Sequence, residues 1–144
     1  MSVCTFIAAD SPLKQVAPPQ EYPLEINIDD GTVYDGGADD NYFLFDFSDS
    51  DSCTNKKYAV YLEWNPTRGR AERLAEYIRA ALNDSETVEL WHIWMGSCEK
   101  PLIRSRTVPI HALTPEDIRA LMDSCVTEEF YDTPIQYRIV ITAE

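Results

Sequence analysis

The chain has 144 residues, of which 44% are hydrophobic and 11% aromatic, and 25 acidic residues against 12 basic ones give a net charge of −13. This length suits one globular domain with a real core, and the aromatic content argues against disorder. The negative charge argues against nucleic-acid binding, which needs basic side chains, and no run approaches the roughly 20 apolar residues of a membrane span.

The first 55 residues predict β-structure broken by connectors. The four prolines of residues 11–23 indicate an extended connector, and residues 29–31 (Asp-Asp-Gly) can turn one strand back onto the next to form a hairpin. A loop over residues 35–41 and a polar segment over residues 48–55 complete this part. The expected strands are Cys4–Ala8, Leu24–Ile28, Thr32–Tyr34 and Tyr42–Phe47.

The remaining residues predict alternating strands and helices. An amphipathic helix is expected over Arg68–Leu82, with Asn65 as its cap and Pro66 at its first position. Its apolar stripe runs from Ala71 to Leu82, and Arg70 is assigned to the polar side. A second helix is expected to begin at Pro115, with Thr114 as its cap and two acids in its first turn. The expected strands are Tyr58–Trp64, Thr87–Met95, Leu102–Ile110 and Ile135–Thr142, with a turn over residues 96–101.

The order strand, helix, strand, strand, helix, strand over residues 56–144 predicts an α+β fold, a ferredoxin-like βαββαβ antiparallel sheet with two helices on one face. Residues 1–55 are expected to pack on it as a β-rich extension, which gives a single domain over 1–144.

The predicted strand Thr87–Met95 is apolar on both faces. One face carries Val88, Leu90, His92 and Trp94, and the other carries Glu89, Trp91, Ile93 and Met95. A sheet with one solvated face should alternate cleanly, so a cover for the second face is expected. The N-terminal β-segment, a second subunit and a ligand are the three candidates.

Known chemical motifs are not found in the sequence. The four cysteines, Cys4, Cys53, Cys98 and Cys125, form no C-x-x-C pair, which predicts reduced thiols rather than a zinc site or disulfides. A calcium loop beginning at Asp35 would lack the glycine required at its sixth position, so a solvated turn is favoured. No catalytic residue, metal or cofactor is predicted, and an enzyme is the less favoured class. The N-terminus lacks the pattern of a secretory signal, which predicts a cytoplasmic location.

The negative charge lies mostly in one segment. Residues 15–55 hold ten carboxylates and no lysine or arginine, whereas residues 56–144 hold 14 acids and 11 bases. Because a field of one sign selects partners of the other, we expect a non-enzymatic interaction protein that binds a basic protein surface, as an immunity-type inhibitor or a nucleic-acid mimic. Acidity that serves only solubility is the competing explanation. The candidate contacts are Asp29, Asp30, Asp35, Asp39 and Asp40.

A second hypothesis is a small-molecule-binding or catalytic domain. It would use an aromatic cleft on the sheet face, lined by Tyr61, Glu63, Glu89 and Trp91. Two carboxylates held close together can do acid–base chemistry if burial separates their pKa values. Both hypotheses are compatible with a monomer or a homodimer.

Four stretches of the sequence carry a resemblance: VYDGGADDNYF, YLEWN, GRAERLAEYIRAAL and VELWHIWM. Together they resemble a group of small uncharacterised acidic bacterial proteins, over most of the chain. The group has no established activity, so the resemblance implies a compact cytoplasmic protein and assigns no functional residue.

Overall fold

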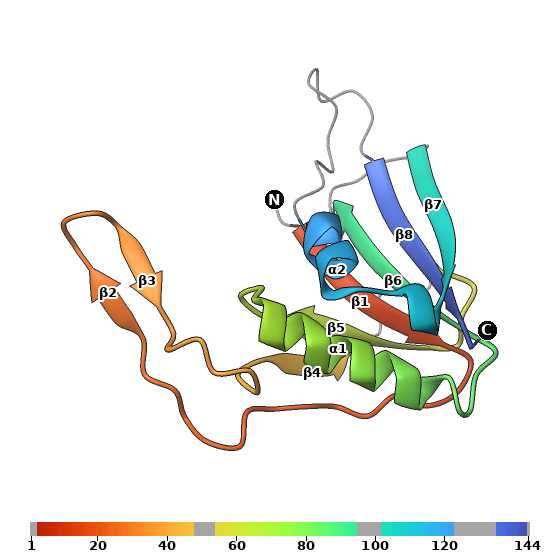
Figure 1. The fold of residues 1–144 in the computed structure, drawn as a ribbon, viewed down its shortest axis with the longest axis horizontal. Coiled ribbons are helices and arrows are strands. Elements are labelled where there is room, and N and C mark those ends of the chain that lie inside the picture. Colours follow the sequence, from red (N-terminus) through yellow and green to blue (C-terminus); the bar gives the residue numbers. More distant parts are fainter. Residues whose placement is uncertain (1–2, 48–53, 95–101, 123–134, 144) are drawn as a thin grey trace.

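A computed structural model describes residues 3–47, 54–94, 102–122 and 135–143 of the chain. It is an α+β structure with a mixed sheet of six strands, ordered β4-β5-β1-β6-β8-β7, and a separate hairpin of two strands (Figure 1). The six strands are β1 (Val3–Ala9), β4 (Phe43–Asp46), β5 (Tyr58–Glu63), β6 (Thr87–Trp94), β7 (Leu102–Pro109) and β8 (Ile135–Thr142). The hairpin strands are β2 (Glu25–Asn27) and β3 (Thr32–Tyr34).

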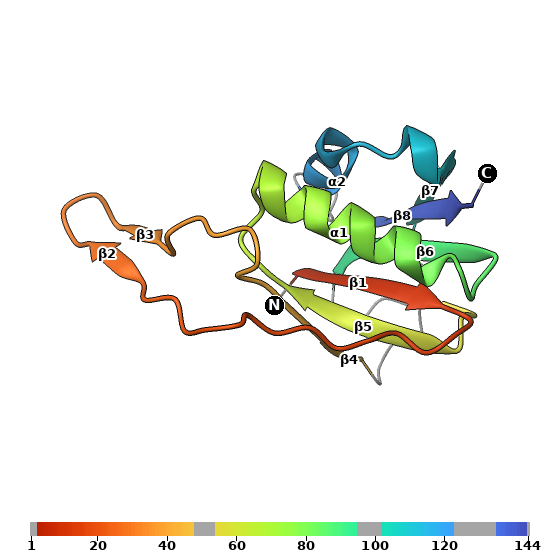
Figure 2. The same ribbon diagram turned by 60° about the horizontal axis from the view of Figure 1, so that its bottom comes forward.

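Two helices, α1 (Arg68–Ala81) and α2 (Pro115–Met122), lie on the same face of the six-stranded sheet (Figure 2). A short 3₁₀ turn, η2 (Ile110–Ala112), joins β7 to α2. The predicted placement of both helices on one face is therefore confirmed. The main core lies between helices and sheet, where Leu74 and Ile78 of α1 and Ile118 of α2 are fully buried.

The strand order differs from the predicted ferredoxin-like sheet in two ways. The sheet is not antiparallel throughout, because β7 and β8 are parallel neighbours joined through α2. In addition, β1 lies between β5 and β6, pairing antiparallel with both. The ferredoxin-like order is thus not confirmed, and the statement that holds is a mixed six-stranded sheet with two helices.

The N-terminal segment contributes to the sheet rather than packing on it as a cover. Strand β1 pairs over seven residues with β6, from Val3 opposite Trp94 to Ala9 opposite Val88. Strand β4 forms one edge of the same sheet through its pairing with β5. For β1 and β4 the expectation that the N-terminal β-segment covers the second sheet face is wrong, because their backbone hydrogen bonds are made within that sheet.

The second face has its own apolar cluster. Phe6 from β1 stacks on Trp91 from β6 with ring centroids 5.8 Å apart, and Phe47, just after β4, lies 5.0 Å from Phe6. The guanidinium of Arg138, from β8, also packs on this cluster, because it lies 5.2 Å from the centroid of the Trp91 ring. Phe6 and Trp91 are at most 1% exposed. The face is therefore packed at its centre.

Helix α2 begins as the sequence predicts, and α1 begins at the predicted Arg68 but with a different cap. Asp117 N–H donates to Thr114 Oγ1, and Thr114 N–H donates to Asp117 Oδ2, which is a reciprocal capping box. For α1 the cap is Thr67, whose hydroxyl accepts from Arg70 N–H, so Asn65 and Pro66 lie before the helix. Thr67 has extended backbone angles, and it is the position from which a side-chain oxygen can reach the first free N–H groups.

Candidate functional site

The β2–β3 hairpin projects away from the rest of the described structure (Figures 1 and 2). We call residues 24–34 the arm. Its turn is closed locally: Gly31 N–H donates to the Asn27 carbonyl, and Gly31 has the positive φ of 72° that favours glycine. The Asp30 carboxylate accepts from the backbone N–H and the hydroxyl of Thr32, and these bonds lower the pKa of Asp30. The turn is thus closed by hydrogen bonds within the arm itself.

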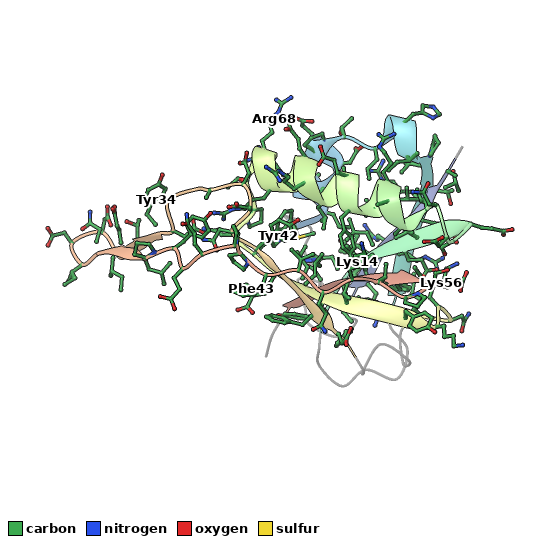
Figure 3. The ribbon with its side chains drawn as sticks, turned by 90° about the horizontal axis from the view of Figure 1, so that it is seen from below. Lys14, Tyr34, Tyr42, Phe43, Lys56 and Arg68 are labelled. Atoms are coloured by element: carbon green, nitrogen blue, oxygen red, sulfur yellow. The ribbon has the colours of Figure 1, made fainter. Side chains whose placement is uncertain are left out.

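The arm exposes large apolar side chains. Leu24, Ile26 and Ile28 are 62%, 68% and 90% exposed; Ile26 lies in β2, Leu24 directly precedes this strand and Ile28 follows it in the turn. Tyr34, labelled in Figure 3, is also exposed. An isolated two-stranded hairpin is marginal in water, and contiguous exposed apolar surface usually marks an interaction site. The arm therefore has the features of a surface that is completed by a partner.

The charged residues of the arm are all acidic, namely Glu25, Asp29 and Asp30. Of the five predicted contact residues, only Asp29 and Asp30 lie on the arm, at its turn. The other three lie where the chain returns to the core. The five aspartates therefore do not form one patch, and the structure separates them into a turn pair and a base group.

Asp35 fastens the base of the arm to helix α1. Its carboxylate accepts two hydrogen bonds from the guanidinium of Arg70, at 2.8 and 3.0 Å, and a third from Gly37 N–H. Arg70 is fully buried and also donates to the carbonyls of Ala38 and Asn65. The Arg70 hydrogen bonds hold the pKa of Asp35 below its ordinary value. Asp35 is thus an internal anchor rather than an open contact.

Asp39 and Asp40 also have roles within the base. Asp39 lies against Gly69 in the first turn of α1, so close that a Cβ at Gly69 would overlap its carboxylate. No acidic residue of α1 itself lies in that turn, and an acid there interacts favourably with the helix dipole. Asp40 accepts a hydrogen bond of 2.5 Å from the hydroxyl of Tyr22, which raises the pKa of Tyr22.

The burial of Arg70 corrects its assignment to the polar side of the helix. The sequence contained a signal for it: Arg70 is four residues before Leu74 and eight before Ile78, so it continues their buried stripe. An arginine in such a stripe needs a carboxylate partner. The acid-rich loop over residues 35–41, just before β4, could supply that carboxylate.

A cleft of about 960 Å³ lies beside the base of the arm. One wall is the connector over residues 17–24, and the other is formed by the start of β4 and the end of β5. Three aromatic residues, Tyr22, Phe43 and Trp64, line it together with the carboxylates of Glu21 and Glu63. Figure 3 shows Phe43 where the arm meets the sheet. Tyr22, Phe43 and Trp64 were not predicted as site residues, since they come from three segments that only the fold brings together.

The four residues proposed to line an aromatic cleft on the sheet face do not line a common cleft. Glu89 and Trp91 are buried, Tyr61 is half-buried, and Glu63 is exposed at the cleft beside the arm. The Glu89 carboxylate accepts hydrogen bonds from Thr54 Oγ1 and from Trp91 Nε1, the latter at 2.9 Å, and lies 3.7 Å from Arg138. The Glu89 carboxylate therefore has its hydrogen-bond and charge partners within the protein.

His92 lies on the other face of β6, toward the helices. Its Nδ1 is 2.8 Å from the hydroxyl of Thr5, and burial lowers its pKa. Cys4 is also buried, whereas Cys53, Cys98 and Cys125 lie outside the described residues, as do the predicted turn 96–101 and most of the polar segment 48–55.

Within the described ranges, no group of three or more His, Cys, Asp or Glu side chains is placed to hold a metal ion. None of the helices described is long and apolar enough to cross a membrane. Comparison with protein-family models, curated proteins and solved structures gives no significant match to this chain. The proposals that follow therefore rest on the geometry alone.

Proposed function

We propose that this chain is a non-enzymatic interaction protein that binds a basic protein surface through its arm. The observation that carries the proposal is the arm itself: a projecting hairpin whose Leu24, Ile26 and Ile28 are exposed and whose charged residues are all acidic. Burying those three side chains would supply most of the affinity, and the carboxylates would steer association with a basic partner.

The hairpin also has main-chain groups to offer. Strands β2 and β3 pair only with each other among the described elements, so each leaves one backbone edge open. An open edge can accept a strand of another protein, in which main-chain hydrogen bonds give affinity and alternate side chains give specificity. The partner that fits has an extended segment with apolar side chains on one face and lysine or arginine nearby.

This chemistry favours an immunity-type inhibitor over a nucleic-acid mimic. A mimic presents carboxylates in place of phosphates, yet Asp35 pairs with Arg70 and Asp40 accepts from Tyr22. The exposed apolar side chains of the arm have no counterpart in a phosphate-binding groove. They do have a counterpart in a protein surface that mixes apolar and basic residues.

Site-specific photo-crosslinking tests the proposal. A photoreactive phenylalanine analogue at Ile28, on the arm, is compared with the same residue at Arg79, on the exposed face of α1, in extract of the source organism. A basic protein crosslinked from position 28 and not from position 79 is the expected result. Crosslinking from both positions alike, or only to a second copy of this chain, contradicts the proposal.

Binding kinetics with the captured protein give the second measurement. The variant Ile26→Ser/Ile28→Ser should raise the dissociation rate, because it removes apolar contact. The variant Glu25→Gln/Asp29→Asn/Asp30→Asn should lower the association rate and its dependence on salt. An association rate of the parent chain that does not respond to ionic strength would refute the electrostatic part of the mechanism.

A further inference from the structure

The cleft beside the arm combines aromatic surface with negative charge. Tyr22, Phe43 and Trp64 line it, and its charged residues are Glu21, Glu63 and Asp35, with no lysine or arginine among the described lining residues. Asp35 is already paired with Arg70. Among the described residues Glu21 and Glu63 have no ion-pair partner, so the cleft presents their charge beside aromatic rings.

Phe43 and Glu63 form a pair of an aromatic ring and a carboxylate at the cleft. They are direct partners across β4 and β5, which places the ring and the carboxylate side by side on the same sheet face. Phe45 stacks on Phe43 at 5.2 Å and holds that ring in place. A planar cation that stacks on an aromatic face while its edge meets a carboxylate would satisfy both groups at once.

From this geometry we infer that the cleft receives an arginine side chain of the same basic partner, an inference that rests on the proposed function and names one of its contacts. Arginine fits better than lysine, because the guanidinium is flat, stacks on aromatic rings and binds a carboxylate through two parallel N–H groups. The amide side chains of Asn41 and Asn65 also line the cleft and can accept from the remaining N–H groups.

The size and position of the cleft agree with a side chain presented by a peptide. Its volume of about 960 Å³ is near the upper end of ligand pockets and exceeds the need of one side chain. Leu24, the first residue of the arm, is part of its lining. A partner strand that lies along the arm would thus reach the cleft with no break in the interface.

The indole group of Trp64 can report on binding in the cleft, because Trp64 is one of its lining residues. Its indole Nε1–H is buried and has no acceptor among the described residues. An unsatisfied buried donor is unfavourable, so its environment should respond when the cleft is filled. In a ¹H–¹⁵N spectrum its indole signal can be assigned among those of the three tryptophans by the Trp64→Phe variant.

The probe is the capped peptide Gly-Gly-Arg-Gly-Gly, compared with the same peptide containing lysine or citrulline. The arginine peptide should shift the Trp64 indole signal in a saturable way, and citrulline, which has the shape without the charge, should not. Lysine should bind at least about fivefold more weakly, given a difference of roughly 1 kcal/mol in stacking and bidentate contacts. Equal binding of arginine and citrulline, or of arginine and lysine, would overturn the inference.

Matched variants locate the site. Glu63→Gln and Phe43→Ala should each weaken arginine-peptide binding about fivefold. Glu86→Gln, which makes the same charge change at an exposed position before β6, should leave it unchanged. Equal effects of Glu63→Gln and Glu86→Gln would show a general response to charge and no site.

The arm variant separates this inference from the proposed function. With the photoreactive residue kept at position 28, Ile26→Ser should reduce partner crosslinking and leave the peptide titration unchanged, because Ile26 does not line the cleft. If the peptide fails to bind while the arm still crosslinks a basic protein, the cleft inference falls and the proposed function stands.

Discussion

Removing the Asp35 carboxylate is the sharpest test of how the arm is held. The change Asp35→Ala deletes the two charged hydrogen bonds from Arg70 and leaves a guanidinium that is fully buried. Breaking a buried ion pair by removing one partner typically costs about 3–5 kcal/mol. Arg70 keeps its bonds to the carbonyls of Ala38 and Asn65, and the Asp35 side chain is 15% exposed, so water can partly replace it. We therefore expect a loss of about 3 kcal/mol, at the lower end of that range.

Chemical unfolding at neutral pH, followed by tryptophan fluorescence, measures this loss directly. For a chain of this length the melting temperature should fall by about 10 °C. The matched control is Asp29→Ala, an exposed aspartate at the turn of the arm, which should change the free energy of unfolding by less than about 0.5 kcal/mol. Replacing both partners, Asp35→Leu with Arg70→Met, should recover much of the loss, because no unpaired charge then remains buried.

The pH dependence gives an independent check. Because the folded pKa of Asp35 is lowered, its stabilisation is present above the ordinary pKa of 3.8 and is lost as the pH falls through the folded value. The difference between the parent chain and Asp35→Ala should therefore shrink below about pH 4. If Asp35→Ala is no less stable than Asp29→Ala at neutral pH, the anchor reasoning is refuted.

Three further predictions concern other contacts. Gly69→Ala should destabilise by about 1 kcal/mol because its Cβ would overlap the Asp39 carboxylate, and the same change made in an Asp39→Ala background should instead stabilise, as alanine normally does in a helix. Burial lowers the pKa of His92, so the unfolding free energy should fall as the pH drops below about 6.5, and His92→Gln should flatten this slope in pH-dependent unfolding. Glu89→Ala should cost about 2–3 kcal/mol in urea unfolding because Trp91 Nε1 loses its acceptor inside the packed second face, and a loss below 0.5 kcal/mol would contradict that view.

Local signals in the sequence predicted the elements well. The hairpin formed because Asp30 and Gly31 close its turn, and α2 began where the Thr114 and Asp117 capping box allowed it. Each of these structures depends on groups within a few residues of one another. Such contacts are visible in the order of residues.

The strand order was not predicted, because it depends on pairings between distant segments. A signal was nevertheless present in the first strand: Phe6, Ile7, Ala8 and Ala9 are consecutive apolar residues, and all four are fully buried. A strand that is apolar on both faces suits the centre of a sheet better than an edge or a cover. Giving weight to that pattern would have placed β1 inside the sheet.

The cleft could not be predicted either, since Tyr22, Phe43 and Trp64 belong to segments with different local structures. The pairing of β4 with β5 and the isolated bridge between Val16 and Leu44 help to bring the connector beside the strands. The spacing of residues in the sequence does not indicate that these three segments lie together in the fold.

The division of the aspartates bears on whether the acidity serves only solubility. A purely solubilising charge should point outward, yet Asp35 and Asp40 are used in internal hydrogen bonds and Asp39 lies against α1. The remaining two of these five aspartates, Asp29 and Asp30, are on the arm, next to exposed apolar side chains. Like charges on two arms would oppose pairing between copies, as charged residues do on protected sheet edges. Under the proposed function the same charges would favour a basic partner, and the arm would then combine attraction toward that class of protein with repulsion between its own copies.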